Sequence, residues 1–269
     1  MASHFTSLGF NISNHEDFSN YFQLTHENGD KIKTNLGTYI KWNIGCGIEL
    51  WGQLDVNNSA IGLNPHFSGT SRIKVRIQNK IRRDNDSELD GAFNCWADPT
   101  EIEEDGVYPF VFDLPDMANY NNIEMPQTVL AQITGFAHEL SAYRNDEEFD
   151  NSQESIPKFA SKSFIPVGLF SQYGENNTQP EAMAIFSGHV IETRKIKNPF
   201  TGKEFIWVKV NTLGGEYDIV ADPEVVDGNI SIDGVVFGTF WLSGRIIGEY
   251  SERERKKEKF SLHKFLKKK

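Results

Sequence analysis

The strongest constraint in this chain is a run of strictly alternating residues at positions 71–81, SRIKVRIQNKI. Apolar side chains occupy positions 73, 75 and 77, and basic side chains occupy positions 72, 74 and 76. Because successive side chains of a strand point to opposite faces, this run predicts a strand with one buried and one solvated face. A second predicted strand lies at 203–212, KEFIWVKVNT, with positions 205, 207 and 209 on one face and 206, 208 and 210 on the other. The 22 glycines and the 12% of aromatic residues also favour sheets joined by turns.

The order of the segments predicts an α+β fold in two domains. We expect residues 1–170 to form a mixed β-sheet domain with flanking helices, with βαβββ-type modules as one way of building it. Residues 180–250 are expected to form a small closed β-barrel, because a sheet of so few strands buries both edges only by closing. The segment at 171–181, SQYGENNTQPE, is polar and contains glycine and proline, which predicts a linker.

Local patterns predict the remaining elements. Asn14 is a favourable N-cap, and apolar residues at helical spacing follow it, so we expect a helix over 15–28. Residues 3–12 alternate as in a strand, and 128–143 is a long apolar run that we also interpret as a strand. The polar stretch 146–162 is expected to be helical in part. Further strands are expected at 38–44, 47–54, 59–67 and 71–81.

The charge is unevenly distributed. The net charge is −11, yet residues 251–269 form a basic tail with nine Lys or Arg against three Glu. The rest of the chain is therefore strongly acidic, which argues against general nucleic-acid binding by the globular part and leaves it open for the tail. The tail can dock on a partner, pack on the acidic body of the chain, or serve only solubility.

Two cysteines, Cys46 and Cys95, are too few for a disulfide scaffold. No signal-peptide pattern opens the sequence, and no apolar stretch has the length of a membrane span. We therefore expect a cytoplasmic protein whose partner is a small molecule or another protein.

The 184–247 segment resembles an oligonucleotide/oligosaccharide-binding (OB) barrel. The resemblance depends on the order of its strands and on Gly238 and Gly244, which are spaced to let a long last strand bend. It implies a surface that binds nucleic acids or sugars through exposed aromatic side chains. The residues that it places on this surface are Phe205, Trp207 and Tyr217.

Residues 3–80 resemble a module of the vicinal-oxygen-chelate (glyoxalase/bleomycin-resistance) superfamily. The likeness depends on the order strand, helix and three strands, on the opening His4-Phe5-Thr6, and on the segment GIELW around Glu49. It implies a divalent metal held by His4 and Glu49. A faint echo of residues 5–18 at 133–149 would add His138, although no second glutamate strand follows it.

Three tryptophans and a histidine are candidates for a small-molecule pocket, since aromatic side chains commonly line such sites. They are Trp42, Trp51, His66 and Trp96, and the alternative for the tryptophans is filling of the core. His66 lies in NPHFSG, which we interpret as a turn. No GxSxG, HExxH or GxGxxG motif is present. We therefore expect a binding or interaction protein, with a metal-dependent enzyme and an oligonucleotide- or sugar-binding barrel as the alternatives.

Overall fold

A computed structural model describes residues 4–100, 105–154, 156–167, 169 and 180–250. Two α-helices and three short 3₁₀ helices accompany two β-sheets in these ranges, which confirms the β-rich α+β class. The basic tail and most of the expected linker lie outside the described residues. None of the helices described here has the length and apolar character that crossing a bilayer requires.

The helical elements are η1 (Thr6–Leu8), α1 (His15–Asn28), η2 (Met117–Tyr120), α2 (Asp146–Ser152) and η3 (Pro223–Val225). The strands of the small sheet are β1 (Asp30–Lys33), β2 (Thr38–Gly45), β3 (Ile48–Leu54) and β4 (Ala60–Phe67). The first strands of the large sheet are β5 (Ile73–Ile81), β6 (Ala92–Ala97), β7 (Tyr108–Asp113), β8 (Gln127–Tyr143) and β9 (Ser163–Val167). The later ones are β10 (Met183–Lys197), β11 (Glu204–Thr212), β12 (Gly215–Ala221), β13 (Val226–Asp227) and β14 (Val235–Glu249).

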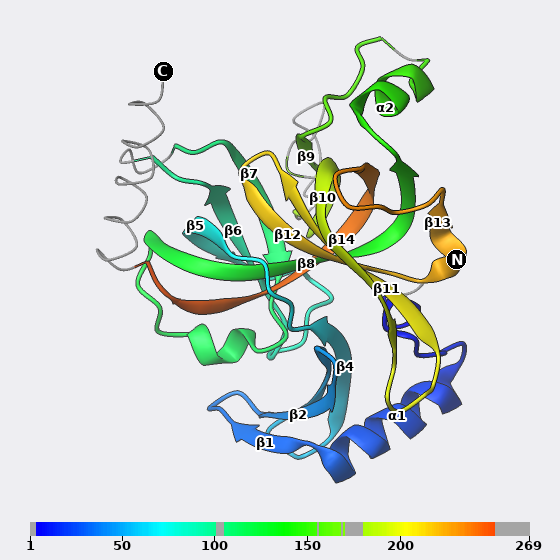
Figure 1. Ribbon diagram of the computed structural model, residues 1–269. Helices are drawn as coiled ribbons and strands as arrows, with labels where there is room; N and C mark the ends of the chain where they lie inside the picture. The colour runs from blue at the N-terminus through cyan, green and yellow to red at the C-terminus, as the bar shows by residue number, and fades with distance from the viewer. Residues whose placement is uncertain (1–3, 101–104, 155, 168, 170–179, 251–269) are drawn as a thin grey trace.

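Helix α1 covers one face of the small sheet (Figure 1). The Asn14 side chain accepts a hydrogen bond from the Asp17 amide, so the expected N-cap and the expected helix over 15–28 are both confirmed. The strand expected at 3–12 is wrong. A 3₁₀ turn occupies that stretch, and Gly9 ends it in the left-handed region at φ 76°.

The small sheet is an antiparallel meander with two different faces. Ile48 and Leu50 point toward α1 and pack in an apolar cluster with aromatic side chains of that helix. The residues that alternate with them on β3, Glu49, Trp51 and Gln53, are buried on the opposite face, toward the large sheet. The interface between the two sheets is therefore polar as well as buried.

The large sheet contains two groups of four strands with the same pattern of pairing: β5–β8, and β10, β11, β12 and β14. In each group, three consecutive strands form an antiparallel meander, and the first of them pairs antiparallel with the long strand of its own group. The third strand of each group runs parallel to the long strand of the other group. The two long strands, β8 and β14, pair with each other along their length (Figure 1). Followed from each strand to its neighbour, the hydrogen-bonded pairings form two circuits. One contains β5, β6, β7, β14 and β8, and the other contains β10, β11, β12, β8 and β14, so both include β8 and β14.

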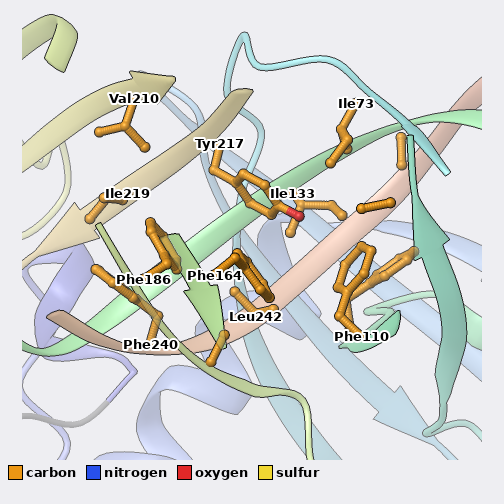
Figure 2. Close-up of a cluster of buried hydrophobic side chains, with 14 of the residues drawn as sticks. Ile73, Phe110, Ile133, Phe164, Phe186, Val210, Tyr217, Ile219, Phe240 and Leu242 are labelled. Atoms are coloured by element: carbon orange, nitrogen blue, oxygen red, sulfur yellow. The ribbon is translucent and has the colours of Figure 1, made fainter. Parts of the chain in front are cut away.

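The expected division into separate cores at 171–181 is not what the pairing shows. One buried cluster contains Ile73 and Phe110 from before that segment and Phe186, Tyr217 and Leu242 from after it (Figure 2). The strands of 180–250 complete their pairing only with β8, which belongs to the expected first domain. The sequence did not indicate that strands from the two expected domains pair with each other, because strand partners far apart in the chain leave no local pattern.

Asp218, on β12, holds the loop after β4 against the large sheet by hydrogen bonds. Its fully buried carboxylate accepts hydrogen bonds from the amides of Thr70 and Ser71, at 3.2 and 2.9 Å. It also accepts from Gln132 Nε2 at 2.9 Å and from Trp207 Nε1 at 2.8 Å. Four donors from three parts of the chain therefore depend on this one carboxylate.

We expect Asp218→Ala to lower the free energy of unfolding by about 3 kcal/mol or more, because it leaves these buried donors without an acceptor. Urea denaturation measures the effect. Asp227→Ala, at an exposed aspartate of β13, is the control and should change stability by less than about 0.5 kcal/mol. A loss below about 1 kcal/mol in Asp218→Ala would show that the loop does not depend on this carboxylate.

Candidate functional site

A buried polar layer lies where the small sheet meets β14 and the segment before η2. Its members carry charge or hydrogen-bonding groups and come from β2, β3, β4, β14 and that segment. They are Lys41, Glu49, Trp51, His66, Asp116, Ser243 and Arg245.

Glu49 is the centre of this polar layer and is 3% exposed. Its Oε1 lies 2.8 Å from Lys41 Nζ, and its Oε2 accepts a hydrogen bond from Trp51 Nε1 at 2.9 Å. Arg245 Nη1 approaches Oε2 at 3.7 Å, and the guanidinium lies 5.3 Å from the centre of the Trp51 ring. Arg245 also reaches Asp116 Oδ2 at 3.9 Å, so two carboxylates and two cations balance one another.

Three atoms of the polar layer are buried without a hydrogen-bond partner among the residues described. They are His66 Nε2, Asp116 Oδ1 and Arg245 Nε. Burial raises the pKa of Asp116, although Arg245 acts in the opposite direction. Each buried polar atom left without a partner costs about 1–3 kcal/mol, so this interface is not arranged for stability alone.

A small polar cleft, which we call the Arg83 cleft, opens beside the polar layer. Its volume is about 200 Å³. It lies between β4, the turn at 83–91, the end of β7 and the middle of β14. The residues of the cleft that carry polar groups are Asn64, Arg83, Asp86, Asp90, Asp113, Trp241 and Ser243.

Arg83 is held in one orientation on the wall of this cleft. Its Nη1 donates to Asp113 Oδ1 at 2.8 Å, and its Nε donates to the Pro180 carbonyl at 3.0 Å. Its Nη2 is buried and has no acceptor in the described part of the chain. The guanidinium therefore presents one unused donor from a fixed position.

The carboxylates of the Arg83 cleft have different surroundings. Asp113 accepts from Trp241 Nε1 at 2.6 Å as well as from Arg83, and burial raises its pKa while Arg83 lowers it. Asp90 accepts from Gln53 and Asn64 at 2.7 and 3.1 Å. With Asp86, three carboxylates line the same cleft as the Arg83 guanidinium, which favours ligands that donate hydrogen bonds.

His66 and Ser243 form a hydrogen bond of 2.9 Å between Nδ1 and Oγ. The turn expected at His66 is wrong, because the residue lies on β4 and is fully buried. Burial lowers the pKa of His66 well below its usual range, and Arg245 and Lys41 add to this effect. The other ring nitrogen of His66, Nε2, has no hydrogen-bond partner among the described residues, so no carboxylate orients this imidazole as the third member of a triad.

The expected metal ligands do not come together as a set. His4 and His138 do meet, with their Nε2 atoms 3.2 Å apart and their rings stacked. Glu49 instead belongs to the polar layer, and the described residues contain no group of three side chains arranged to hold a metal ion. A wider groove of about 910 Å³ lies beside His138, but none of the buried unpartnered side-chain atoms found in the described residues lines it.

The aromatic candidates are separated by the fold. Trp42 packs against Phe200, and Trp51 lies on the opposite face of the small sheet within the polar layer. Trp96 is half-buried on β6. The surface expected on the barrel is wrong, because its residues are 0–4% exposed and lie in the two main apolar clusters. They are Phe205, Trp207 and Tyr217.

Sequence reasoning missed Arg83, Asp113 and Arg245. Arg83 directly precedes the segment DNDSELDG at 84–91, whose acidic and turn-forming residues indicated a solvated loop. Asp113 ends a short apolar strand in the same turn-rich region. The sequence contains no signal for this cleft, since an arginine beside an acidic turn does not indicate which distant strand faces it.

Comparison with known proteins adds no family and no relative. No family model, curated protein or solved structure matches this chain.

The contact between His4 and His138 leads to a prediction about how stability depends on pH. Burial, together with the nearby His138, lowers the pKa of His4 from 6.5 to about 4. Between these values the unfolded chain binds more protons than the folded one, so this stabilisation is present above pH 6.5 and is lost as the pH falls toward 4.

We expect the drop in unfolding free energy from pH 7.5 to pH 5.0 to be about 2 kcal/mol smaller in His4→Gln than in the wild type. Urea denaturation at the two pH values measures the drop. His26→Gln, at an exposed histidine of α1, is the matched control and should keep the wild-type difference. An unchanged pH dependence in His4→Gln would contradict the burial of a neutral His4.

Proposed function

We propose that this protein binds a small polyhydroxylated molecule, a sugar or polyol, in the Arg83 cleft without transforming it. The observation that carries the proposal is the unused, buried Nη2 donor of Arg83 beside three carboxylates. A hydroxyl group both donates and accepts hydrogen bonds, so a polyol satisfies the carboxylates and the guanidinium together. An ammonium group only donates, and a carboxylate only accepts.

The size of the Arg83 cleft supports the same ligand class. A volume of about 200 Å³ is below the range of roughly 300–1,000 Å³ that is usual for drug-sized ligands. The rings of His4 and Phe136 pack on Trp241, with centroids 4.0 and 4.9 Å away, and its Nε1 already donates to Asp113, so this tryptophan offers edge contacts rather than a stacking platform. Recognition in this cleft is therefore by hydrogen bonds.

The chemistry of the polar layer favours binding over catalysis. The nearest hydroxyl, Ser243 Oγ, has a histidine partner that no carboxylate orients among the described residues. The adjoining ion pairs with Lys41 and Arg245 fix Glu49 in place. The enzyme alternative, a metal-dependent one, lacks an assembled ligand set in the described residues.

The pairing circuits support a finer description of the fold. We propose that each circuit is a small OB-like barrel and that the two barrels share β8 and β14. The strand order in each circuit, three antiparallel strands followed by a parallel contact and an antiparallel return, is the order of that fold. Asp113 and Ser243, which pair where β7 meets β14, place the Arg83 cleft at the junction of the two.

The proposal is tested by thermal unfolding with a panel of monosaccharides and polyols, amines, and anions such as phosphate. A ligand at about 100 times its Kd stabilises the folded state by about 2.7 kcal/mol. This should raise Tm by roughly 5–10 °C for a chain of this size. We expect Arg83→Lys to abolish the rise, because lysine keeps the charge but loses the fixed Nη2 donor.

The adjacent Arg82→Lys is the matched control, because the Arg82 side chain is about half exposed and forms an ion pair with Glu88. It should retain the full rise in Tm. A panel in which amines or anions raise Tm and hydroxylated compounds do not would contradict the proposal. An equal rise in Arg83→Lys and in the wild type would do so as well.

A further inference from the structure

The lining of the Arg83 cleft has more acidic than basic side chains. The Arg83 guanidinium is its only cation among the described residues, whereas three carboxylates line it. With all four groups ionised, the lining has a formal charge of −2. The neighbouring Arg82 does not compensate this charge from within the cleft, because it pairs with the exposed Glu88 outside the lining. The three carboxylates are those of Asp86, Asp90 and Asp113.

The Arg83 guanidinium does not serve these carboxylates equally. Its Nη1 lies 2.8 Å from Asp113 Oδ1 but 3.9 Å from Asp86 Oδ1. Asp90 forms no ion pair with any described residue, and the groups that donate hydrogen bonds to it are neutral side-chain and backbone amides. A carboxylate without a cation on the wall of a narrow cleft attracts a positively charged ligand group.

Asp86 and Asp90 also have acceptor positions that the protein leaves unused. A carboxylate accepts about four hydrogen bonds when all of its lone pairs are engaged. Asp90 accepts three, from Gln53, Asn64 and the amide of Ser87. Asp86 accepts one from the Arg83 amide at 2.7 Å. A ligand group with several donors can therefore bond to both carboxylates without displacing an existing hydrogen bond.

The buried Nη2 of Arg83 sets a second requirement. It has no acceptor among the described residues, so the ligand has to supply an oxygen beside its positive charge. A simple amine lacks that acceptor, and a neutral sugar lacks the charge. A metal ion does not fit either, because no three side chains in the described part of the chain are arranged to hold one.

We infer that the preferred ligand of the Arg83 cleft is an amino sugar. Its protonated amine lies against Asp86 and Asp90, and one of its hydroxyl groups accepts the hydrogen bond from Arg83 Nη2. This inference rests on the proposed function, since it names the class of polyhydroxylated molecule that the cleft selects. The ammonium group brings one positive charge and three donors to the two carboxylates that the guanidinium serves least. A uronic acid is disfavoured, because its own carboxylate would face three others.

Isothermal titration calorimetry of the full-length protein at pH 6.5 and 50 mM NaCl tests the inference with glucosamine, glucose, N-acetylglucosamine and glucuronate. Amines of this kind are protonated at that pH. We expect glucosamine to bind about tenfold more tightly than glucose, because hydrogen bonds to charged groups are stronger than those between neutral groups. N-acetylglucosamine, whose nitrogen has no charge, should bind no better than glucose, and glucuronate should bind most weakly. Raising NaCl to 500 mM should reduce the advantage of glucosamine.

The Asp90→Asn variant removes the charge and keeps an amide oxygen of similar size. The preference for glucosamine over glucose should fall below about threefold, with the affinity for glucose within about twofold of the wild type. Asp86→Asn is the second variant and should act in the same direction if the turn does not tolerate the change at Asp90. Glu88→Gln is the matched control, because it removes one charge from the same turn outside the cleft. It should keep the full preference.

The outcomes separate this inference from the proposed function. Equal affinity of the wild type for glucosamine and glucose, with both lost in Arg83→Lys, would overturn the inference and leave the proposed function in place. Binding of none of the hydroxylated compounds would overturn both. An undiminished preference in both Asp90→Asn and Asp86→Asn would overturn the inference alone. Binding of methylamine or CaCl2 as tight as that of glucosamine would also do so, because charge alone would then be sufficient.

Discussion

The antiparallel ladder between β8 and β14 is the interaction on which the arrangement of every other strand depends. It pairs residues from Val129 to Tyr143 with residues from Glu249 to Val235. Each long strand pairs with the first strand of its own group and with the third strand of the other. Neither group has a complete set of neighbours without the other, so the two halves share one buried cluster.

At two glycines, aromatic side chains pack directly against the long strands, which pair with strands of both groups. A Cβ atom on Gly135 would lie 3.1 Å from the ring of Phe240, and one on Gly244 would lie 2.7 Å from the ring of Phe112. Each glycine therefore admits an aromatic side chain against the strand itself. Register shifts at Thr239/Phe240 and at Ile246/Gly248 bend β14 further.

The course of β14 also explains why the Arg83 cleft and the polar layer are neighbours. Trp241, Ser243 and Arg245 alternate along one face of the strand. Trp241 donates to Asp113 in the cleft, Ser243 bonds to His66, and Arg245 reaches Glu49 and Asp116. One strand face thus connects the small sheet with the turn that carries Arg83, so the cleft and the packing of the small sheet are physically linked.

The sequence predicts those parts of this protein that depend on neighbours along the chain. The helix over 15–28, the strand at 128–143 and the alternating strand at 71–81 all follow from local periodicity and agree with α1, β8 and β5. The surface role expected for Phe205 and Trp207 failed for a different reason. Both residues do point out of their own strand group, but Leu8, Phe10 and Phe67 cover them. Whether an outward aromatic residue is exposed depends on a segment almost 200 residues away, which no local pattern encodes.

The charge of each candidate site is also a property that the sequence alone does not predict. A net charge of −11 argues against a polyanion ligand when charge is averaged over the chain. At ionic strengths near 0.15 M, however, exposed charges act over only about 8 Å, so the local arrangement decides which ligand is attracted. The fold places Asp86, Asp90 and Asp113 together at the Arg83 cleft and places the basic residues of β5 on a different face. The net charge of the whole sequence therefore says little about the charge that any one surface presents.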